Sequence, residues 1–180
     1  MDPKTRIVTR QEKRLSQWVR IVSKDVEFAH SQKVETYHCL AQSDYITILA
    51  RTPQGHIPIV RQYRPAVESY TWELPGGLLE DEELPEDACR RELKEETGLD
   101  ARAIRYLGNY YPDTGRLENR LHAFFVLASD PDPKFVTEPG LSVDFVNIKT
   151  LQDRILSGEF KHQLHLGLIT LAILKGIELE

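Results

Sequence analysis

The sequence is poor in cysteine, in long apolar runs and in excess positive charge, and each shortage excludes a class of protein. The two cysteines, Cys39 and Cys89, lie far apart without the spacing of a metal site, so reduced thiols are a simpler interpretation than a disulfide. No apolar run reaches the ~18 residues of a membrane span, and the first residues have no signal-peptide core. The net charge of −5 gives no indication of a nucleic-acid surface. We therefore expect a cytoplasmic protein with neither a membrane nor a nucleic acid as partner.

What the chain does contain is typical of a globular protein. Hydrophobic residues make up 41% and charged residues 28% of its 180 positions, and a chain of this length can bury a substantial core. Repeats, linkers and low-complexity segments are absent from the sequence, so we predict one domain over residues 1–180. Residues 1–14 are polar and charged, and we predict that they form a loose arm.

Apolar and β-branched runs separated by turn residues predict a series of strands. The strands before residue 65 are expected to form an antiparallel meander, with a turn at Thr52-Pro53-Gln54-Gly55. Two helices are expected near the C-terminus, where His162 and His165 lie one turn apart without a third partner and are interpreted as surface or packing residues. The expected strands are residues 15–28, 34–41, 45–51, 57–63, 70–74, 101–111, 121–128 and 141–148, and the expected C-terminal helices are residues 149–156 and 162–174.

The most informative stretch comprises residues 72–99. Its strand is interrupted at residues 75–77, Pro-Gly-Gly, because adjacent glycines adopt backbone angles that other residues avoid. Pro85 is suited to the first turn of a helix, where its missing N–H costs nothing. Gly98 is suited to the left-handed position that ends one. We therefore predict a helix over residues 85–97.

The acidic residues of this predicted helix include two on its apolar side. At about 100° per residue, Glu92 and Glu96 share a face with small apolar residues. Two carboxylates beside apolar packing repel each other and lose hydration, so they need a cation or a proton. Oxygen-only ligand sets suit hard divalent cations, Mg²⁺ above all. Alternatively, the segment is a charged surface helix with i,i+4 pairs such as Arg91–Glu95.

The spacing of these residues resembles that of a known family. Five residues separate Gly77 from Glu83, and seven more lead to the run Arg91-Glu92-Leu93-Lys94-Glu95-Glu96-Thr97-Gly98-Leu99. This pattern resembles the Nudix box at every fixed position of residues 77–99, and a chance match of that length is far rarer than a match to a short glycine motif. The resemblance implies a Nudix hydrolase, an α/β/α sandwich with a mixed sheet, which cleaves a diphosphate linked to another group.

The same resemblance implies roles for the residues of the box. Glu92, Glu96 and the backbone carbonyl of Gly76 would bind Mg²⁺, for which Mn²⁺ can substitute. Arg91 and Glu83 would form a supporting pair that locks the loop against the helix. A diphosphate ester is strongly anionic, so catalysis must neutralise its charge, position a water molecule and remove a proton from that water.

Residues before the box favour one branch of the family. The R-Q-Y-R-P sequence at residues 61–65, followed by Glu73, resembles the branch that hydrolyses ADP-ribose and other nucleoside diphosphate sugars. Arginine suits bidentate phosphate contacts, so Arg64 and Glu73 are expected at the substrate; alternatively, Arg64 is paired with Glu68 or Glu73. The strands over residues 15–50 exceed a minimal Nudix fold and resemble the added N-terminal antiparallel sheet of dimeric members. We therefore expect a homodimer with these residues in its interface.

Two further site residues are expected outside the box. Trp18 is a candidate to stack on the substrate base across a dimer, and packing in the core or interface is the alternative. The catalytic base should come from outside the metal-binding set, and Glu138 is expected to supply it. It lies in a loop over residues 130–140 whose position resembles the loop that carries the base in this branch. Glu118 is the rival for this role.

The predicted activity is Mg²⁺-dependent hydrolysis of the diphosphate bond of ADP-ribose or another nucleoside diphosphate sugar, to a nucleoside monophosphate and a sugar phosphate. One alternative is hydrolysis of a nucleoside triphosphate to a monophosphate and pyrophosphate. The other is a sensor that binds a nucleotide without catalysis. The intact acidic set argues against a sensor, which has no need of metal-binding glutamates. The expected partner is therefore a small-molecule nucleotide sugar.

Overall fold

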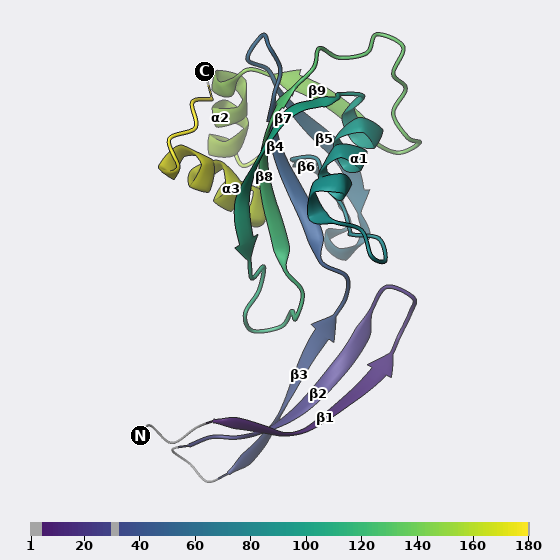
Figure 1. Cartoon of the computed structure of the whole chain (residues 1–180), viewed down its shortest axis with the longest axis vertical. Coiled ribbons are helices and arrows are strands. Elements are labelled where there is room, and N and C mark those ends of the chain that lie inside the picture. Colours follow the sequence, from purple (N-terminus) through teal and green to yellow (C-terminus); the bar gives the residue numbers. More distant parts are fainter. Residues whose placement is uncertain (1–4, 30–32, 180) are drawn as a thin grey trace. The chain divides into compact units, whose positions relative to one another are not determined.

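A computed structural model describes residues 5–29 and 33–179, and these residues form two compact units (Figure 1). The N-terminal unit comprises the described residues up to Asp44 together with Tyr111–Arg120. The core unit comprises Tyr45–Tyr110 and the described residues from Leu121 onward. The prediction of one domain over residues 1–180 stays a prediction.

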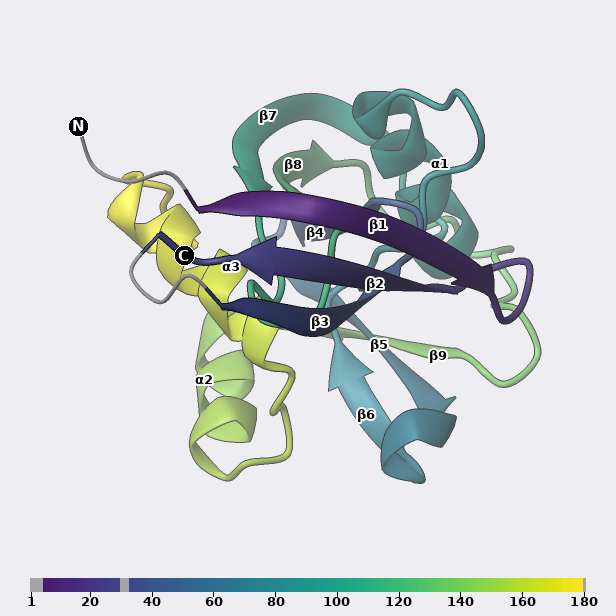
Figure 2. The ribbon, with the colours of Figure 1, turned by 90° about the horizontal axis from the view of Figure 1, so that it is seen from below.

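The N-terminal unit is built on an antiparallel sheet in the order β1-β2-β3, whose strands lie side by side in Figure 2. The strands are β1 (Arg6–Arg14), β2 (Arg20–Glu27) and β3 (Val34–Ala41). The predicted loose arm is therefore wrong for Arg6–Arg14, and residues 1–4 of that prediction lie outside the described residues.

Polar contacts across the sheet explain why β1 was not predicted. All of its side chains are exposed, so the strand lacks the apolar alternation from which strands are predicted. Instead, Arg6 forms an ion pair with Glu27, and the hydroxyl of Thr9 donates a hydrogen bond to Asp25 on β2. Backbone pairing and these polar contacts hold β1 in place.

The core unit contains two three-stranded sheets, one mixed and one antiparallel. In the mixed sheet, of order β4-β8-β7, β4 is parallel to β8 and β7 is antiparallel to it. In the second sheet, β5 lies between β6 and β9. The strands are β4 (Tyr45–Arg51), β5 (Ile57–Arg64), β6 (Ser69–Glu73), β7 (Ala101–Tyr110), β8 (Leu121–Ala128) and β9 (Ser142–Val146), and a short 3₁₀ helix, η1 (Pro65–Val67), joins β5 to β6.

The predicted antiparallel meander does not extend to β4, which instead pairs in parallel with β8. Both faces of β4 are buried. Ile46 and Ile48 contribute to one hydrophobic cluster, whereas Leu49 contributes to the other. A strand buried on both faces gives a nearly continuous apolar run, and that run contains no information about which strand will pair with it.

Helices cover both faces of the core unit, which confirms the predicted α/β/α sandwich. In Figure 1, α1 (Pro85–Thr97) lies on one side of the strands, and α2 (Ile148–Leu156) and α3 (Gln163–Leu174) lie on the other. Helix α1 packs Ala88 and Leu93 against β4 and β8. The bounds predicted for α1 are confirmed, since Pro85 begins it and Gly98, at φ 73°, ends it. None of the helices in the described part of the chain is long and apolar enough to cross a membrane.

Candidate active site

The loop between β6 and α1 is held from both sides at three consecutive residues. The carbonyls of Pro75 and Gly77 accept hydrogen bonds of 2.9 Å from the backbone N–H groups of Ile48 and Ile46 on β4. Between them, the N–H of Gly76 donates a hydrogen bond of 2.9 Å to Oε2 of Glu96 on α1. Gly76 therefore lies between two anchored neighbours, and its N–H group contacts a side chain from the last turn of α1.

Neighbouring atoms lie so close to this loop that both positions require glycine. A Cβ atom at Gly76 would lie 2.2 Å from the carbonyl oxygen of Ile46, and one at Gly77 would lie 2.1 Å from a carboxylate oxygen of Glu92. Such separations are far below van der Waals contact. Glycine thus allows the loop to pass directly between β4 and the acidic face of α1.

Glu92 and Glu96 are both partly buried, and burial raises the pKa of each. For Glu96 the pKa is raised to about 8, although the hydrogen bond from Gly76 opposes the rise. For Glu92, Arg91 opposes the effect of burial without cancelling it. Two desolvated carboxylates offer hard oxygen donors that fit a divalent cation, which would take the place of the proton.

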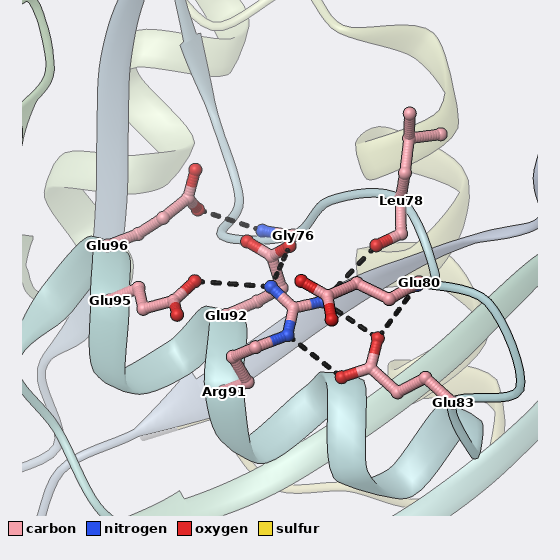
Figure 3. A network of polar contacts seen from close by, with 8 residues as sticks. All are labelled: Gly76, Leu78, Glu80, Glu83, Arg91, Glu92, Glu95 and Glu96. Atoms are coloured by element: carbon pink, nitrogen blue, oxygen red, sulfur yellow. Dashed lines mark hydrogen bonds and ion pairs between the residues drawn. The ribbon is translucent and has the colours of Figure 1, made fainter. Parts of the chain in front are cut away.

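Arg91 connects the loop of the box to the acidic face of α1 (Figure 3). Its guanidinium group donates two hydrogen bonds of 2.8 Å to Glu83, and this contact lowers the pKa of Glu83. It also contacts Glu92 at 2.8 Å and Glu95 at 3.1 Å. The predicted Arg91–Glu83 pair is therefore confirmed as a contact. The i,i+4 pair with Glu95, considered as an alternative, is present as well.

Arg64 is paired with Glu73, which is one of the two alternatives weighed for it. The two hydrogen bonds measure 2.8 and 2.6 Å, and the hydroxyl of Thr71 also donates to Glu73. Burial alone would raise the pKa of Glu73, but these hydrogen bonds outweigh it and leave the pKa lowered. Glu73 is 2% exposed, whereas the Arg64 side chain is 43% exposed. An ionised, buried carboxylate thus fixes an arginine that is still accessible.

Sequence reasoning missed a cluster formed by Glu73, His162 and His165. The Nδ1 atom of His165 accepts a hydrogen bond of 2.9 Å from the backbone N–H of Leu74, and its ring stacks on that of His162 at 3.8 Å between centroids. Burial lowers the pKa of His165 to about 3, so the ring is neutral and its Nδ1 lone pair is available. The available signal was the placement of two histidines one turn apart at the start of a mostly apolar helix.

The remaining predicted residues lie in loops and turns. Glu138 is exposed in the loop before β9. Three residues earlier, the ring of Phe135 packs so closely on Gly98 that a Cβ there would lie 2.4 Å from its Cγ. The loop is therefore in contact with the C-terminal end of α1. Trp18 lies in the turn between β1 and β2 of the N-terminal unit and is 61% exposed.

Glu118, the rival for the role of base, is held within the N-terminal unit. Its carboxylate accepts a hydrogen bond of 2.8 Å from Arg10 and forms an ion pair with Lys24. Burial alone would raise its pKa, but the hydrogen bonds from Lys24 and Arg10 outweigh that effect and lower it. A carboxylate paired with two cations is a poor proton acceptor.

Comparisons with known proteins agree with this arrangement. A family model described as the NUDIX domain matches residues 42–162. The chain is 30% identical over 115 residues to the CMP-5'-(N-acetyl-N-hydroxy-3-aminopropyl)phosphonate hydrolase of Streptomyces rubellomurinus, covering 64% of this chain and 55% of that protein. It is 37% identical over 79 residues to the ADP-ribose pyrophosphatase of Bacillus subtilis, covering 44% and 43%. The chain thus spans about half the length of these curated relatives.

A solved structure shares the fold over almost the whole chain. The crystal structure of an ADP compounds hydrolase aligns with a TM-score of 0.78 over 96% of this chain and 95% of its own. The sequence identity in this alignment is 21%, so the likeness concerns the fold alone.

Proposed function

The chain belongs to the NUDIX family, and on that premise we propose that it hydrolyses the diphosphate bond of ADP-ribose or of another nucleoside diphosphate sugar with the help of Mg²⁺. The products would be a nucleoside monophosphate and a sugar phosphate. The family resemblance that residues 77–99 indicated is thereby confirmed. The substrate and the metal ion are the parts that the proposal adds.

The proposal rests above all on the two desolvated carboxylates held against the Gly76 loop. Glu92 and Glu96 are partly buried with raised pKa values, an arrangement that is unfavourable unless a cation or a proton compensates it. In the proposed complex these two carboxylates and the Gly76 carbonyl hold the metal ion. When bound, Mg²⁺ would supply neutralisation of diphosphate charge and a more acidic water.

Other residues of the chain have supporting roles in this proposal. Arg91, tied to Glu83 by two hydrogen bonds, holds Glu92 in place through a third of 2.8 Å. Arg64 keeps its orientation because the buried Glu73 carboxylate fixes it. Its exposed guanidinium can then bind a phosphate group, since the planar fork of arginine matches phosphate oxygens.

The names of the relatives support a substrate in which a nucleotide is joined to another group. One relative is named for hydrolysis of a CMP-linked phosphonate and another for hydrolysis of ADP-ribose. The R-Q-Y-R-P sequence at residues 61–65 supports the ADP-ribose branch. Hydrolysis of a nucleoside triphosphate is the second candidate, because the metal-binding residues alone do not distinguish the two substrate classes.

A substrate panel tests the proposal directly. Purified protein with Mg²⁺ is incubated with ADP-ribose, other nucleoside diphosphate sugars and nucleoside triphosphates, and the products are identified by mass spectrometry. Glu96→Gln protein serves as the control for contaminating hydrolases. Formation of AMP and ribose phosphate supports the proposal. Formation of pyrophosphate from a triphosphate, with the sugar nucleotides intact, would establish the second candidate instead.

A further inference from the structure

The cluster of Glu73, His162 and His165 has the composition of a metal site, since one possible ligand atom from each residue lies within 4.8 Å of the others. Its geometry argues against a metal ion. The Nδ1 atom of His165 already accepts the N–H of Leu74, so the proton of the neutral ring resides on Nε2, which has no lone pair to offer. In addition, Glu73 accepts hydrogen bonds from the cation Arg64, next to which a metal ion would be repelled.

The ring stacking leads to the same conclusion. The imidazoles of His162 and His165 are 3.8 Å apart between centroids and 14° from parallel. Lone pairs lie in the ring plane, so two nearly parallel rings direct them along parallel lines rather than toward one point. A metal ion midway between the rings would lie far out of both planes. The stack therefore fixes the orientation of the His165 ring and does not chelate.

The His165 ring holds the first residue of the loop between β6 and α1, which is Leu74. Leu74 is 2% exposed, and a buried N–H group without a partner would be costly. Leu74 directly precedes the segment of residues 75–77. Hydrogen bonds from β4 hold Pro75 and Gly77, and Glu96 on α1 accepts the hydrogen bond from the N–H group of Gly76. His165 is an anchor from α3, the helix on the opposite face of the sheets from α1.

We propose that His165 is a positioning residue for the carbonyl of Gly76 and thereby for the metal ion of the proposed site. The contact acts through the backbone of Leu74 and Pro75, two residues before the carbonyl. This inference rests on the proposed function, because it takes the Gly76 carbonyl as a metal ligand. It assigns to α3, which lies outside the box, a part in organising the acidic site.

Three variants separate positioning from mere packing. His165→Asn places an amide oxygen near the position of Nδ1 and keeps the acceptor. His165→Phe keeps a ring of similar size without an acceptor. His165→Leu, which also lacks an acceptor, is used in place of His165→Phe if that variant does not fold. Leu168→Ala is the matched control, because Leu168 is a buried residue of the same helix in the hydrophobic core.

Two measurements on each variant test the proposal. The first is hydrogen exchange of the Leu74 and Gly76 amides in metal-free protein, and the second is the affinity for Mg²⁺ or Mn²⁺ by calorimetry. We expect His165→Phe to accelerate exchange at both amides and to weaken metal binding about tenfold or more, as residues that orient metal ligands do. We expect His165→Asn to stay within about threefold of wild type.

Two results would overturn the positioning role. One is wild-type metal affinity and amide exchange in the variant without an acceptor. The other is an equal loss of metal affinity in Leu168→Ala, which should lower only the melting temperature. The readouts do not depend on turnover. If the wild-type protein hydrolyses no diphosphate, the proposed function fails, while exchange and metal affinity still decide whether His165 positions the loop.

Discussion

The backbone N–H of Gly76 donates a hydrogen bond of 2.9 Å to Oε2 of Glu96, and this contact joins the loop before α1 to the last turn of the same helix. Burial raises the pKa of that carboxyl to about 8. In metal-free protein at neutral pH, Glu96 is therefore mostly protonated. Because a metal ligand must be deprotonated, cation binding has to displace this proton.

The stability of the metal-free protein should depend on pH because the pKa of Glu96 is raised. The pKa in the folded protein, about 8, lies above the ordinary value of 4.5. The associated stability is therefore complete below the ordinary value and is lost as the pH rises through the folded value. We expect the melting temperature in chelator to fall between about pH 4.5 and pH 8 and to level off above this range, and Glu96→Gln to remove this part of the fall. Identical pH profiles for the two proteins would contradict the assignment.

The second prediction concerns the two carboxylates themselves. Glu92→Gln and Glu96→Gln should each lower kcat at least ~100-fold while the fold survives, because a neutral amide is a weak ligand for a hard cation. Steady-state kinetics at saturating Mg²⁺ measure the loss, and circular dichroism checks the fold. Glu86→Gln, on the exposed face of α1, should keep wild-type turnover. Wild-type kcat in either site variant would remove that residue from the metal site.

Two neighbouring arginines of α1 provide a matched comparison for the supporting pair. Arg91 is 25% exposed and donates two hydrogen bonds to Glu83, whereas Arg90 is 49% exposed and pairs with Glu86. Glu83→Gln should lower the free energy of unfolding by about 1–3 kcal/mol, since it weakens a partly buried charged contact. Glu86→Gln should change it by less than about 0.5 kcal/mol. Urea denaturation measures both, and equal effects would show that Arg91 is an ordinary surface residue.

Features that depend on residues close together in the sequence could be predicted, whereas features that depend on distant residues could not. Helix α1 was predicted with its exact bounds because Pro85 and Gly98 act within their own turns. The Arg91–Glu83 contact was predicted because both residues belong to one contiguous pattern. In contrast, β1 is held by polar contacts with β2, and β4 is paired with a strand more than 70 residues away.

The contribution of His165 was out of reach for the same reason. Its partner Leu74 lies 91 residues earlier in the chain, and no pattern within α3 reveals which backbone N–H group will face it. Arg64 illustrates a different limit. Both a phosphate-binding role and a pairing with Glu73 were open, because a long cationic side chain can serve either purpose until its neighbours are placed.

Homodimerisation is the fourth prediction. A small sheet needs three or more strands with a buried hydrophobic face, or packing against another element, for independent stability, yet Trp18, Val34 and Tyr37 of the N-terminal unit are 61%, 56% and 43% exposed. A second copy of the chain would cover these residues, so we expect a homodimer with residues 15–50 in its interface. Light scattering at micromolar concentration tests this. A mass near the 20.7 kDa of one chain would contradict it, whereas a dimer that Trp18→Asp dissociates would support it.

The last prediction is that Glu138 is the general base. Glu92 and Glu96 are assigned to the metal ion, and Glu118 is paired with Arg10 and Lys24 and has a lowered pKa. Glu138 is exposed, and its loop reaches the end of α1 through the contact of Phe135 with Gly98. A loop anchored there can carry a proton acceptor to a substrate bound beside the last turn of the helix.

Glu138→Gln should therefore lower kcat by ~10² or more and leave substrate affinity nearly unchanged, because the amide keeps the shape of the side chain but accepts no proton. Glu118→Gln should leave kcat close to wild type. Steady-state kinetics give kcat, and substrate binding measured separately gives the affinity. A fall in affinity with unchanged kcat would make Glu138 a substrate contact. An unaffected enzyme would transfer the role of base to Glu118 or to a glutamate of the box.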